Sequence, residues 1–383
     1  MESKVDVEIC TSLSEVAADE WNALTSVNDP FVQHAFLCTL ESSGSVGKET
    51  GWQPCHILIR QEGHLVGATP LYLKDHSYGE YIFDWAWANG SERAGIPYYP
   101  KLLSAIPFTP VTGARLLGDA KWHPTLMKAA MQLAQQLQAS SVHWLFTPTF
   151  ASPHPKAMSR HSLQFHWHNP SSPQNPITRF DDWLSLFHQK DRKKVRAERR
   201  KAQASVDEIM HLTGSELTDE HIDFLWTAYV HTATKKWGQT YLSKAFFDAL
   251  SQSLAPFVHV FFAKKQDRLV ASSLCFQHGS HFYGRYWGAL DDFDCLHFEL
   301  CYHQPIEWCL QQGLMLFEAG AQGVHKLKRG LLPQPTYSWH WIAHPGLGNA
   351  IQDFLDEESQ DVLNSIEHHR SHSPLKTAHN RSK

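Results

Sequence analysis

Charged side chains and long apolar runs are both scarce in this chain of 383 residues. Only 19% of the residues are charged, whereas 42% are hydrophobic and 12% aromatic. That balance excludes an intrinsically disordered chain, because burial of apolar side chains can offset the conformational entropy lost on folding. No stretch approaches about 18 consecutive apolar residues, and the N-terminal sequence lacks a basic lead followed by an apolar core. We therefore expect no membrane span and no export signal, and we expect the protein in the cytoplasm.

Paired cysteines, a positive net charge and familiar catalytic motifs are also missing. The seven cysteines include no CxxC pair, which is typical of free thiols in a reducing compartment. The formal charge of −5 means that any contact with a polyanion must be local. P-loop, dinucleotide-binding, serine-hydrolase and kinase motifs are absent, which disfavours those activities. Zinc-binding spacings are absent too, so we expect no metal, although His166 and His168 share a strand face.

The chain does contain an internal repeat built around two β-hairpins. Residues 55–60 and 65–74 flank a short turn with a glycine, and residues 258–263 and 269–277 repeat this arrangement. Two helix-like stretches precede each hairpin, and a helix and a strand follow it. The predicted helices are residues 14–24, 32–42, 123–137, 219–236, 244–254 and 298–312, and the strands after the hairpins are residues 142–146 and 314–318. Each half therefore predicts a layered, mixed α/β unit with its own core.

The join between the halves falls in a segment rich in proline and serine, residues 151–176. We divide the chain into an N-terminal domain of residues 1–160 and a C-terminal domain of residues 161–370. Residues 371–383 have almost no apolar content and predict a disordered tail.

A basic stretch at residues 190–201 predicts a helix with eight Lys or Arg side chains. Such a charge run usually forms a solvated helix face. The alternative is a phosphate-rich partner, because several of these cations recur three and four residues apart. A nucleic-acid-binding module would also need stacking aromatics, which the stretch lacks. The cations on one side are Arg192, Lys193, Arg196, Arg199 and Arg200.

The sequence FEAGAQGVHKLKRG from Phe317 predicts a short buried strand that runs into an irregular, glycine-rich loop. Glu318 at the strand end would place a base beside cations, in a backbone that can approach a ligand closely. A surface loop with a satisfied carboxylate is the alternative. The side chains that follow Glu318 are His325, Lys326, Lys328 and Arg329.

Tyr283, Arg285 and Trp287 alternate along a predicted strand and therefore share one face. An arginine between two aromatics is a plausible lining for a ligand site. Alternating aromatic side chains also pack against neighbouring strands of a sheet. Sheet packing therefore stays open as an alternative to a ligand site.

The chain resembles the FemAB-like group of predicted N-acyltransferases for peptidoglycan biosynthesis or recognition, within the wider GNAT superfamily. Nearly the whole chain takes part, including FVQHAFLCTLESSG from Phe31, YGRYWG from Tyr283, HFELCYHQPIEW from His297 and the block from Phe317. The resemblance implies two GNAT-like domains in tandem, with mainly antiparallel sheets flanked by helices. Two departures leave the donor open: the long helical arm of some Fem ligases is missing, and the phosphate-cradling loop of acetyl-CoA-dependent enzymes is not evident.

The resemblance implies transfer of an acyl or aminoacyl group from acyl-CoA, such as acetyl-CoA, or from aminoacyl-tRNA to an amine, either a small molecule or a peptide such as a peptidoglycan precursor. Glu318 or His325 would remove the proton from that amine, and backbone N–H groups at 320–323 would hold the oxyanion. The expected donor-binding and phosphate-binding residues are Gly320, Gln322, Gly323, Lys326, Lys328, Arg329, Arg192 and Arg196. The expected acceptor-lining residues are Tyr283, Arg285, Trp287, Asp84 and Trp85.

A non-catalytic protein that recognises a cell-wall peptide or amine ligand is the alternative function. The first half fits a loss of activity, because TPTFASPHP after its last strand has no acidic and basic loop like the one after Glu318. Fold by itself does not fix function. We expect the first domain to shape the acceptor site. The sequence does not predict an oligomeric state.

Overall fold

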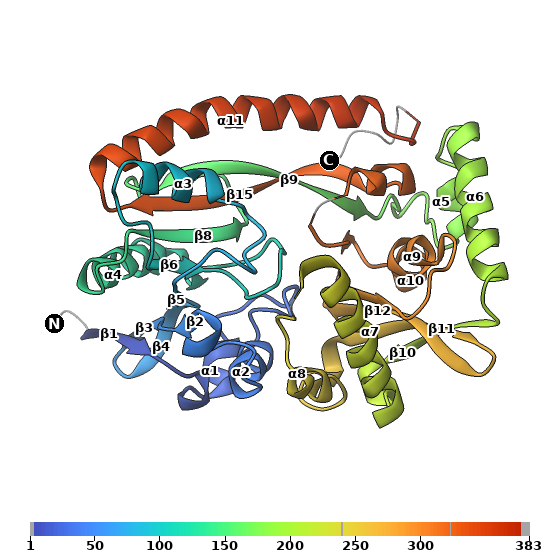
Figure 1. The fold of residues 1–383 in the computed structure, drawn as a ribbon, viewed down its shortest axis with the longest axis horizontal. Helices are drawn as coiled ribbons and strands as arrows, with labels where there is room; N and C mark the ends of the chain where they lie inside the picture. Colours follow the sequence, from blue (N-terminus) through green and yellow to red (C-terminus); the bar gives the residue numbers. More distant parts are fainter. Residues whose placement is uncertain (1–3, 239, 322, 377–383) are drawn as a thin grey trace. The chain divides into compact units, whose positions relative to one another are not determined.

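In the computed structural model, which describes residues 4–238, 240–321 and 323–376, the chain divides into two compact units (Figure 1). Unit 1 consists of residues 1–163 and 335–364, and unit 2 of residues 164–334 and 365–383. Strands β9 (Met158–His168) and β15 (Leu332–Ile342) and helix α11 (Pro345–Ser371) each contribute residues to both units. The predicted fold class, two mixed α/β units with mainly antiparallel sheets flanked by helices, is confirmed.

The units are not the two continuous segments expected from the sequence. The expected boundary at residue 160 lies near residue 163, where the chain first passes from unit 1 to unit 2. Residues 335–364, however, pack with unit 1, and residues 365–376 return to unit 2. The expected tail is partly ordered as well, because the apolar Leu375 is buried and forms a β-bridge with Phe187. The rest of that tail, residues 377–383, lies outside the described residues.

Unit 1 holds two groups of paired strands. One has the order β1-β3-β4-β7, and the other the order β15-β8-β6-β5-β2. Parallel pairing occurs between β6 and β8, and the other pairs described within unit 1 are antiparallel. The elements are β1 (Val5–Cys10), α1 (Ala18–Asn22), α2 (His34–Ser42), β2 (Trp52–Pro54), β3 (His56–Gln61), β4 (His64–Thr69), β5 (Tyr72–Lys74), α3 (Trp85–Arg93), β6 (Lys101–Ser104), β7 (Leu117–Gly118), α4 (His123–Gln136) and β8 (Ser141–Thr147).

The core of unit 1 has two layers, one on each face of strand β8. Helix α4 buries Met127 and Ala130 against Val142 and Trp144, which point to one face because side chains alternate along a strand. On the other face, His143 lies 6.1 Å from the ring of Trp87 in α3. A second cluster on that side joins Trp87 to apolar residues of β15 and α11: Ile342, Leu347, Ile351 and Leu355.

Unit 2 contains one run of strands in the order β10-β11-β12-β13-β14-β9. Only the β13–β14 pair is parallel among the pairings described for these strands. The elements are α5 (Phe180–Leu184), α6 (Gln189–Ala204), β10 (Glu208–Thr213), α7 (Asp219–Trp237), α8 (Lys244–Asp248), β11 (Val258–Lys265), β12 (Arg268–His278), β13 (His281–Ala289), α9 (Leu296–Phe298), the π-helix η7 (Glu299–His303), α10 (Gln304–Gln312), β14 (Leu316–Glu318) and the 3-10 helix η8 (Val324–Arg329).

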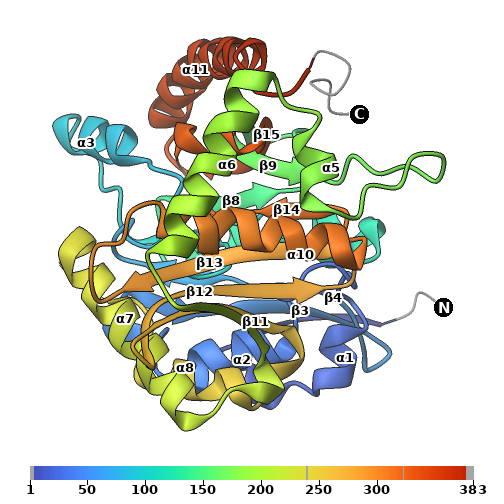
Figure 2. The ribbon, with the colours of Figure 1, turned by 90° about the vertical axis from the view of Figure 1, so that its right-hand side faces the viewer.

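Helices cover both faces of the unit 2 strands. Figure 2 shows α7 and α8 below β11–β13, and α10 above them. Helix α7 approaches β13 so closely that a Cβ on Gly288 would lie 2.5 Å from the carbonyl carbon of Ala228. Glycine is therefore required at this helix–sheet contact.

Both predicted hairpins are confirmed, as β3–β4 and β11–β12. The predicted helices at 32–42, 123–137 and 219–236 are also present, within a few residues. The aromatic segments after the hairpins differ, however. Residues 281–289 form strand β13, whereas the corresponding segment of unit 1 leads into helix α3, so that the repeat does not extend through this part.

Candidate functional site

Three neighbouring strands of unit 2 place three side chains from the sequence analysis in one row. Glu318, the last residue of β14, is the register partner of Tyr283 in β13 and of His166 in β9. Residues directly opposite one another on neighbouring strands lie close together. All three side chains are buried, with exposures of 2% for Glu318, 1% for Tyr283 and 6% for His166. The strand end predicted to carry the base therefore lies inside the unit.

The carboxylate of Glu318 faces an uncharged histidine. Its Oε2 lies 3.7 Å from Nε2 of His166, which is also 3.1 Å from Oε1 of Gln164. Burial, with His168 contributing in the same direction, lowers the pKa of His166 to about 3. His166 is therefore neutral at physiological pH, and an N–H at Nε2 would donate to Oε1 of Gln164, with the carboxylate of Glu318 beside it.

The loop after Glu318 wraps around the amine of Lys326. Nζ of Lys326 donates hydrogen bonds to the carbonyl oxygens of Gly320 at 2.6 Å and Ala321 at 3.2 Å. The side chain is 2% exposed, and burial lowers its pKa to about 7. An ammonium held by neutral carbonyls in this environment is only weakly favoured over the free amine. Lys326 thus lies inside the loop and is committed to its backbone.

Two of the loop glycines take positive φ angles. Gly320 has φ +77° and Gly323 has φ +106°, a region in which other residues are strained. A Cβ on Gly323 would also lie 2.5 Å from the ring of His325. Gln322, predicted with them, lies outside the described residues.

His325 belongs to an aromatic cluster beside the loop. Its Nε2 lies 2.9 Å from the hydroxyl oxygen of Tyr302, in the π-helix. The ring of His297 lies 6.2 Å from His325 and 5.2 Å from Trp287. Trp287, which was predicted to line the acceptor site, therefore reaches the same cluster. Tyr302 was not singled out by the sequence, because only the π-helical turn brings its hydroxyl to the loop.

The remaining predicted cations differ in accessibility. Arg329 is bound to Glu198 at 2.8 Å and its guanidinium lies 3.6 Å from the ring centre of Phe298. Lys328 is exposed and donates to the carbonyl oxygen of His372 at 3.3 Å. Of the predicted acceptor-lining residues, Arg285 lies near the loop, since a Cβ on Gly320 would be 3.9 Å from its Nη1.

Arg192 and Arg196 lie on α6. Arg192 donates to the carbonyl oxygen of Ser185 at 3.5 Å, and Arg196 binds Asp181 at 3.0 Å on the surface. These two predicted phosphate-binding residues are therefore on an exposed helix and not in the loop after β14.

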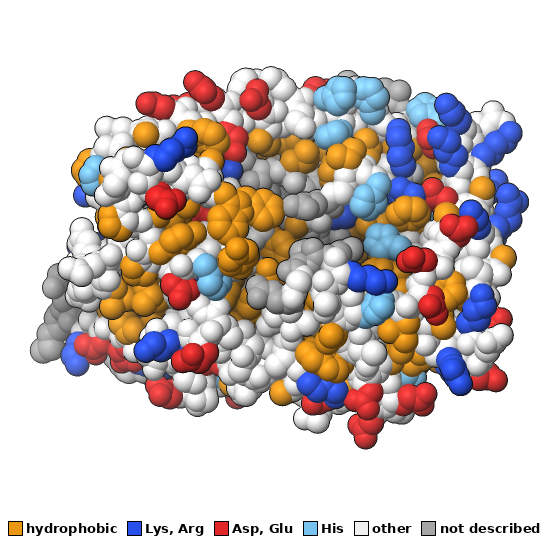
Figure 3. Space-filling view, viewed as in Figure 1, with side chains coloured by type: hydrophobic (Ala, Val, Ile, Leu, Met, Phe, Trp, Pro, Cys, Tyr) orange, Lys and Arg blue, Asp and Glu red, His pale blue; other side chains and the backbone are white. Residues whose placement is uncertain are grey.

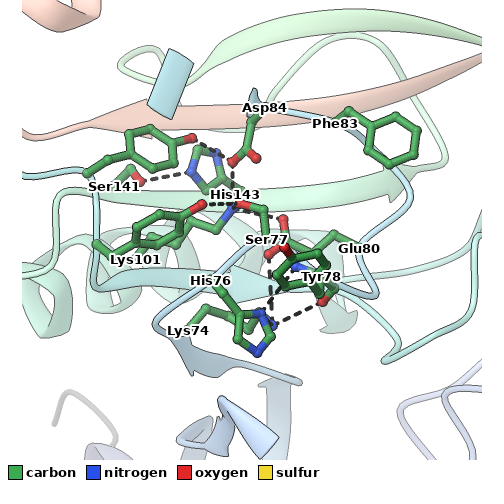
Figure 4. A network of polar contacts seen from close by, with 12 residues as sticks. Lys74, His76, Ser77, Tyr78, Glu80, Phe83, Asp84, Lys101, Ser141 and His143 are labelled. Carbon is green, nitrogen blue, oxygen red and sulfur yellow. Dashed lines mark hydrogen bonds and ion pairs between the residues drawn. The ribbon is translucent and has the colours of Figure 1, made fainter. Parts of the chain in front are cut away.

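Asp84 and Trp85, also predicted to line the acceptor site, belong to unit 1. Asp84 lies in a buried polar network (Figure 4), where its Oδ2 accepts hydrogen bonds from Nζ of Lys101 and, at 2.6 Å, from the hydroxyl of Tyr98. Nζ of Lys101 also binds Oε2 of Glu80 at 2.8 Å. Trp85 is 37% exposed, and its ring lies 5.3 Å from that of Tyr78. Asp84 thus serves the unit itself, whereas Trp85 presents a face to solvent.

Burial and pairing compete in this unit 1 network. Burial alone would raise the pKa of Asp84, but Lys101 outweighs it and lowers the pKa to about 2. For Glu80 burial prevails over Lys101 and raises the pKa to about 7. Burial also lowers the pKa of Lys74, 4.0 Å from Glu80, to about 7. The network is therefore close to charge balance at neutral pH.

No group of three or more His, Cys, Asp or Glu side chains that could hold a metal ion occurs among the described residues. Within the same residues, no helix combines the length and the apolar character needed to cross a membrane.

The FemAB-like family, described as peptidoglycan biosynthesis/recognition, matches residues 12–377. The chain belongs to this family. A search of curated proteins finds no match to this FemAB-like chain. Among solved structures it resembles the C-terminal domain of a putative lysylphosphatidylglycerol synthetase from Agrobacterium fabrum, with 9% identity, a TM-score of 0.55 and coverage of 90% of this chain and 96% of that one.

Two further structures resemble the FemAB-like chain. A conserved protein of unknown function from Bacteroides thetaiotaomicron shares 10% identity with a TM-score of 0.50, over 88% of this chain and 99% of that one. A crystal structure of FemX shares 11% identity with a TM-score of 0.47, over 80% of this chain and 92% of that one.

Proposed function

We propose that this FemAB-like chain transfers an acyl or aminoacyl group from an activated donor, acyl-CoA or aminoacyl-tRNA, to the amine of an acceptor such as a peptidoglycan precursor. The observation that carries the proposal is the buried carboxylate of Glu318 at the end of β14, opposite neutral His166 and followed by a loop closed around Lys326. The family description links the chain to peptidoglycan biosynthesis or recognition. We place the reaction in the cytoplasm.

Proton removal is the first requirement, because an ammonium has no lone pair for attack. The ammonium releases one proton to solvent to give the free amine, and the attacking nitrogen loses a second proton as the C–N bond forms. Glu318 is our choice of base, since an unprotonated carboxylate within hydrogen-bond reach can accept the proton as the C–N bond forms. That second proton then passes to the leaving group, the sulfur of coenzyme A or the ribose oxygen of tRNA, as its bond to the carbonyl carbon breaks. His325 is the second choice, because its ring lies in the partly open aromatic cluster.

Stabilisation of the oxyanion is the second requirement. The carbonyl of Gly320 points to Nζ of Lys326, and in a trans peptide the next N–H points the opposite way. Lys326 therefore fixes the N–H of Ala321 so that it faces away from the lysine, as a preorganised donor must be fixed before the reaction. In this proposal Lys326 is a positioning residue and does not bind the donor's phosphates, which was its role in the sequence-based prediction.

Substitution of Glu318 by Gln tests the proposal. We expect kcat to fall about 100-fold or more, the usual contribution of a general base, with a KM close to that of the unchanged chain. Turnover is measured with acetyl-CoA, longer acyl-CoAs and aminoacyl-tRNA as donors and with amine acceptors that include peptidoglycan precursors. Glu220→Gln, at an exposed position of α7, is the matched control.

Unchanged turnover in Glu318→Gln would exclude this role. Saturable binding of an amine or peptide without turnover under any donor would favour the alternative function, a binding protein for cell-wall peptides.

A further inference from the structure

A groove with four arginines in its walls lies between α5, α6 and α10 of unit 2. Its volume is about 670 Å³, within the range of small-molecule sites. Arg196, Arg199 and Arg200 come from α6, and Arg179 comes from the residue before α5. Figure 3 shows Lys and Arg side chains gathered over the part of the surface where Figure 1 places α6. The sequence motif at 190–201 therefore contributes to a concave surface as well as to a solvated face.

Two of the four arginines already have acidic partners. Arg199 donates to Glu299 at 2.9 Å and to Glu307 at 2.6 Å, and its guanidinium lies 4.2 Å from the ring centre of Phe180. Arg196 binds Asp181 at 3.0 Å. These contacts hold the walls of the groove in place and neutralise part of its charge.

The other two arginines are uncommitted. Among the described residues, neither Arg179 nor Arg200 forms an ion pair or a side-chain hydrogen bond, and both are exposed. Each presents a planar fork of N–H donors that matches the oxygens of a phosphate or a carboxylate. Two free cations suit a phosphate, which carries a charge between −1.5 and −2 near pH 7, better than a single carboxylate.

We propose that this groove binds the phosphate groups of a small phosphorylated ligand, with Arg179 and Arg200 as the contacts that grip them. The volume of the groove suits a small molecule. Lys190 and Lys194 of the same helix do not line the groove, which disfavours a nucleic-acid strand that follows the whole basic helix. Glu198, the neighbour of Arg199, binds Arg329 in the loop helix η8, which links the groove to the candidate active site. That the ligand is the phosphate-bearing end of the donor rests on the proposed function; the binding itself does not.

Titration calorimetry of the full chain with inorganic pyrophosphate tests the groove. The double variant R179Q/R200Q should bind at least 10-fold more weakly than the unchanged chain, because it removes both uncommitted cations. The matched control K190Q/K194Q removes the same charge from exposed positions of α6 and should weaken binding less than 2-fold. Equal losses in the two variants would mean unspecific attraction to a basic helix, and that result, or no binding to the unchanged chain, would overturn the proposal.

Competition experiments separate the possible ligands. Displacement of pyrophosphate by coenzyme A, which carries a diphosphate and a phosphomonoester, supports a small phosphorylated ligand. If a short RNA duplex binds equally to both double variants without displacing pyrophosphate, RNA binds outside the groove, which supports a small ligand inside it. RNA binding without any pyrophosphate binding overturns the proposal. Pyrophosphate binding in a chain without transferase turnover would support phosphate binding in the groove. It would refute only the part of the proposal in which the groove holds the phosphates of the acyl donor.

Discussion

The two units each bury a lysine beside a segment that the sequence analysis predicted to belong to the site, but they give it different partners. In unit 1, Lys101 is 0% exposed and binds the carboxylates of Glu80 and Asp84. Burial by itself lowers the pKa of Lys101, yet these carboxylates outweigh it and raise the pKa above its usual value. In unit 2, Nζ of Lys326 donates to two carbonyl oxygens of the loop, and burial lowers its pKa to about 7.

The difference separates a lysine held in its charged form from one whose protonation state can change near neutral pH. A buried charge paired with opposite charges is locked in one protonation state, and its loss leaves the partners uncompensated. A buried amine bound only by dipoles can change its state near neutral pH, a property that is concentrated at functional sites. Lys74 of unit 1 shares the lowered pKa of about 7 but lies 4.0 Å from the carboxylate of Glu80, so the comparison distinguishes Lys101 from Lys326 and not unit 1 from unit 2.

The largest effect should come from Lys101→Met in unit 1. This change leaves Glu80 and Asp84 buried without their cation, and we expect the free energy of unfolding to fall by about 3–5 kcal/mol. Urea denaturation followed by fluorescence measures it. Lys121→Met, at a lysine 63% exposed in its side chain, should change stability by less than about 1 kcal/mol. Similar small losses in both variants would contradict the structural role of Lys101.

Lys326→Met should act on turnover more than on stability. If Lys326 fixes the N–H of Ala321, turnover should fall about 100-fold, as when one oxyanion donor is lost. The unsatisfied carbonyls of Gly320 and Ala321 should lower the free energy of unfolding by about 1–3 kcal/mol. Lys235→Met, at an exposed position of α7, is the control for both measurements. A fall in stability without a fall in turnover would reduce Lys326 to a structural residue like Lys101.

Acid should destabilise both units through buried histidines. Burial lowers the pKa of His143 in unit 1 and of His166 in unit 2 to about 3. Between about pH 6.5 and pH 3 the unfolded chain binds a proton at each site that the folded chain does not, so stability falls as pH falls, by about 1.4 kcal/mol per pH unit for each histidine.

Urea denaturation between pH 6.5 and 5 measures that slope. His143→Asn and His166→Asn should each remove about one histidine's share, whereas His64→Asn, at an exposed position, should leave the slope unchanged. A slope unaffected by either buried substitution would show that these side chains are protonated in the folded chain.

The smallest effect on stability should come from Trp85→Ala in unit 1. The side chain is 37% exposed, so the free energy of unfolding should fall by less than about 1 kcal/mol. If Trp85 lines the acceptor site as the sequence analysis expects, the KM for the amine should rise several-fold while kcat changes little. An unchanged KM would confine the acceptor site to residues other than Trp85.

Local patterns in the sequence predicted the elements whose contacts lie nearby in the chain. The hairpins 55–74 and 258–277 and the helix at 123–137 depend on alternation, a short turn and apolar residues three and four apart. Glu318 at the end of a short strand was predicted for the same reason. These features need no knowledge of distant residues.

The partners of the site residues could not be predicted in this way. His166 meets Glu318 only through the pairing of β9 with β14, although the two residues are 152 positions apart in the chain. The sequence analysis did not single out Lys101 or Glu80, and only the fold brings Glu80 and Asp84 to Lys101. The burial of Lys326 likewise depends on the path of the loop around it. Long-range pairing, and not local propensity, decides which charged groups lose water.

The packing of residues 335–364 with unit 1 has a consequence for folding during translation. Strand β8 pairs with β6 on one side and with β15 on the other, yet β15 leaves the ribosome only after most of unit 2. Until then the fully buried β8 has an open edge, which invites pairing with another chain. The N-terminal unit must therefore wait until β15 has been synthesised before it can close, and a fragment that stops at residue 163 should aggregate.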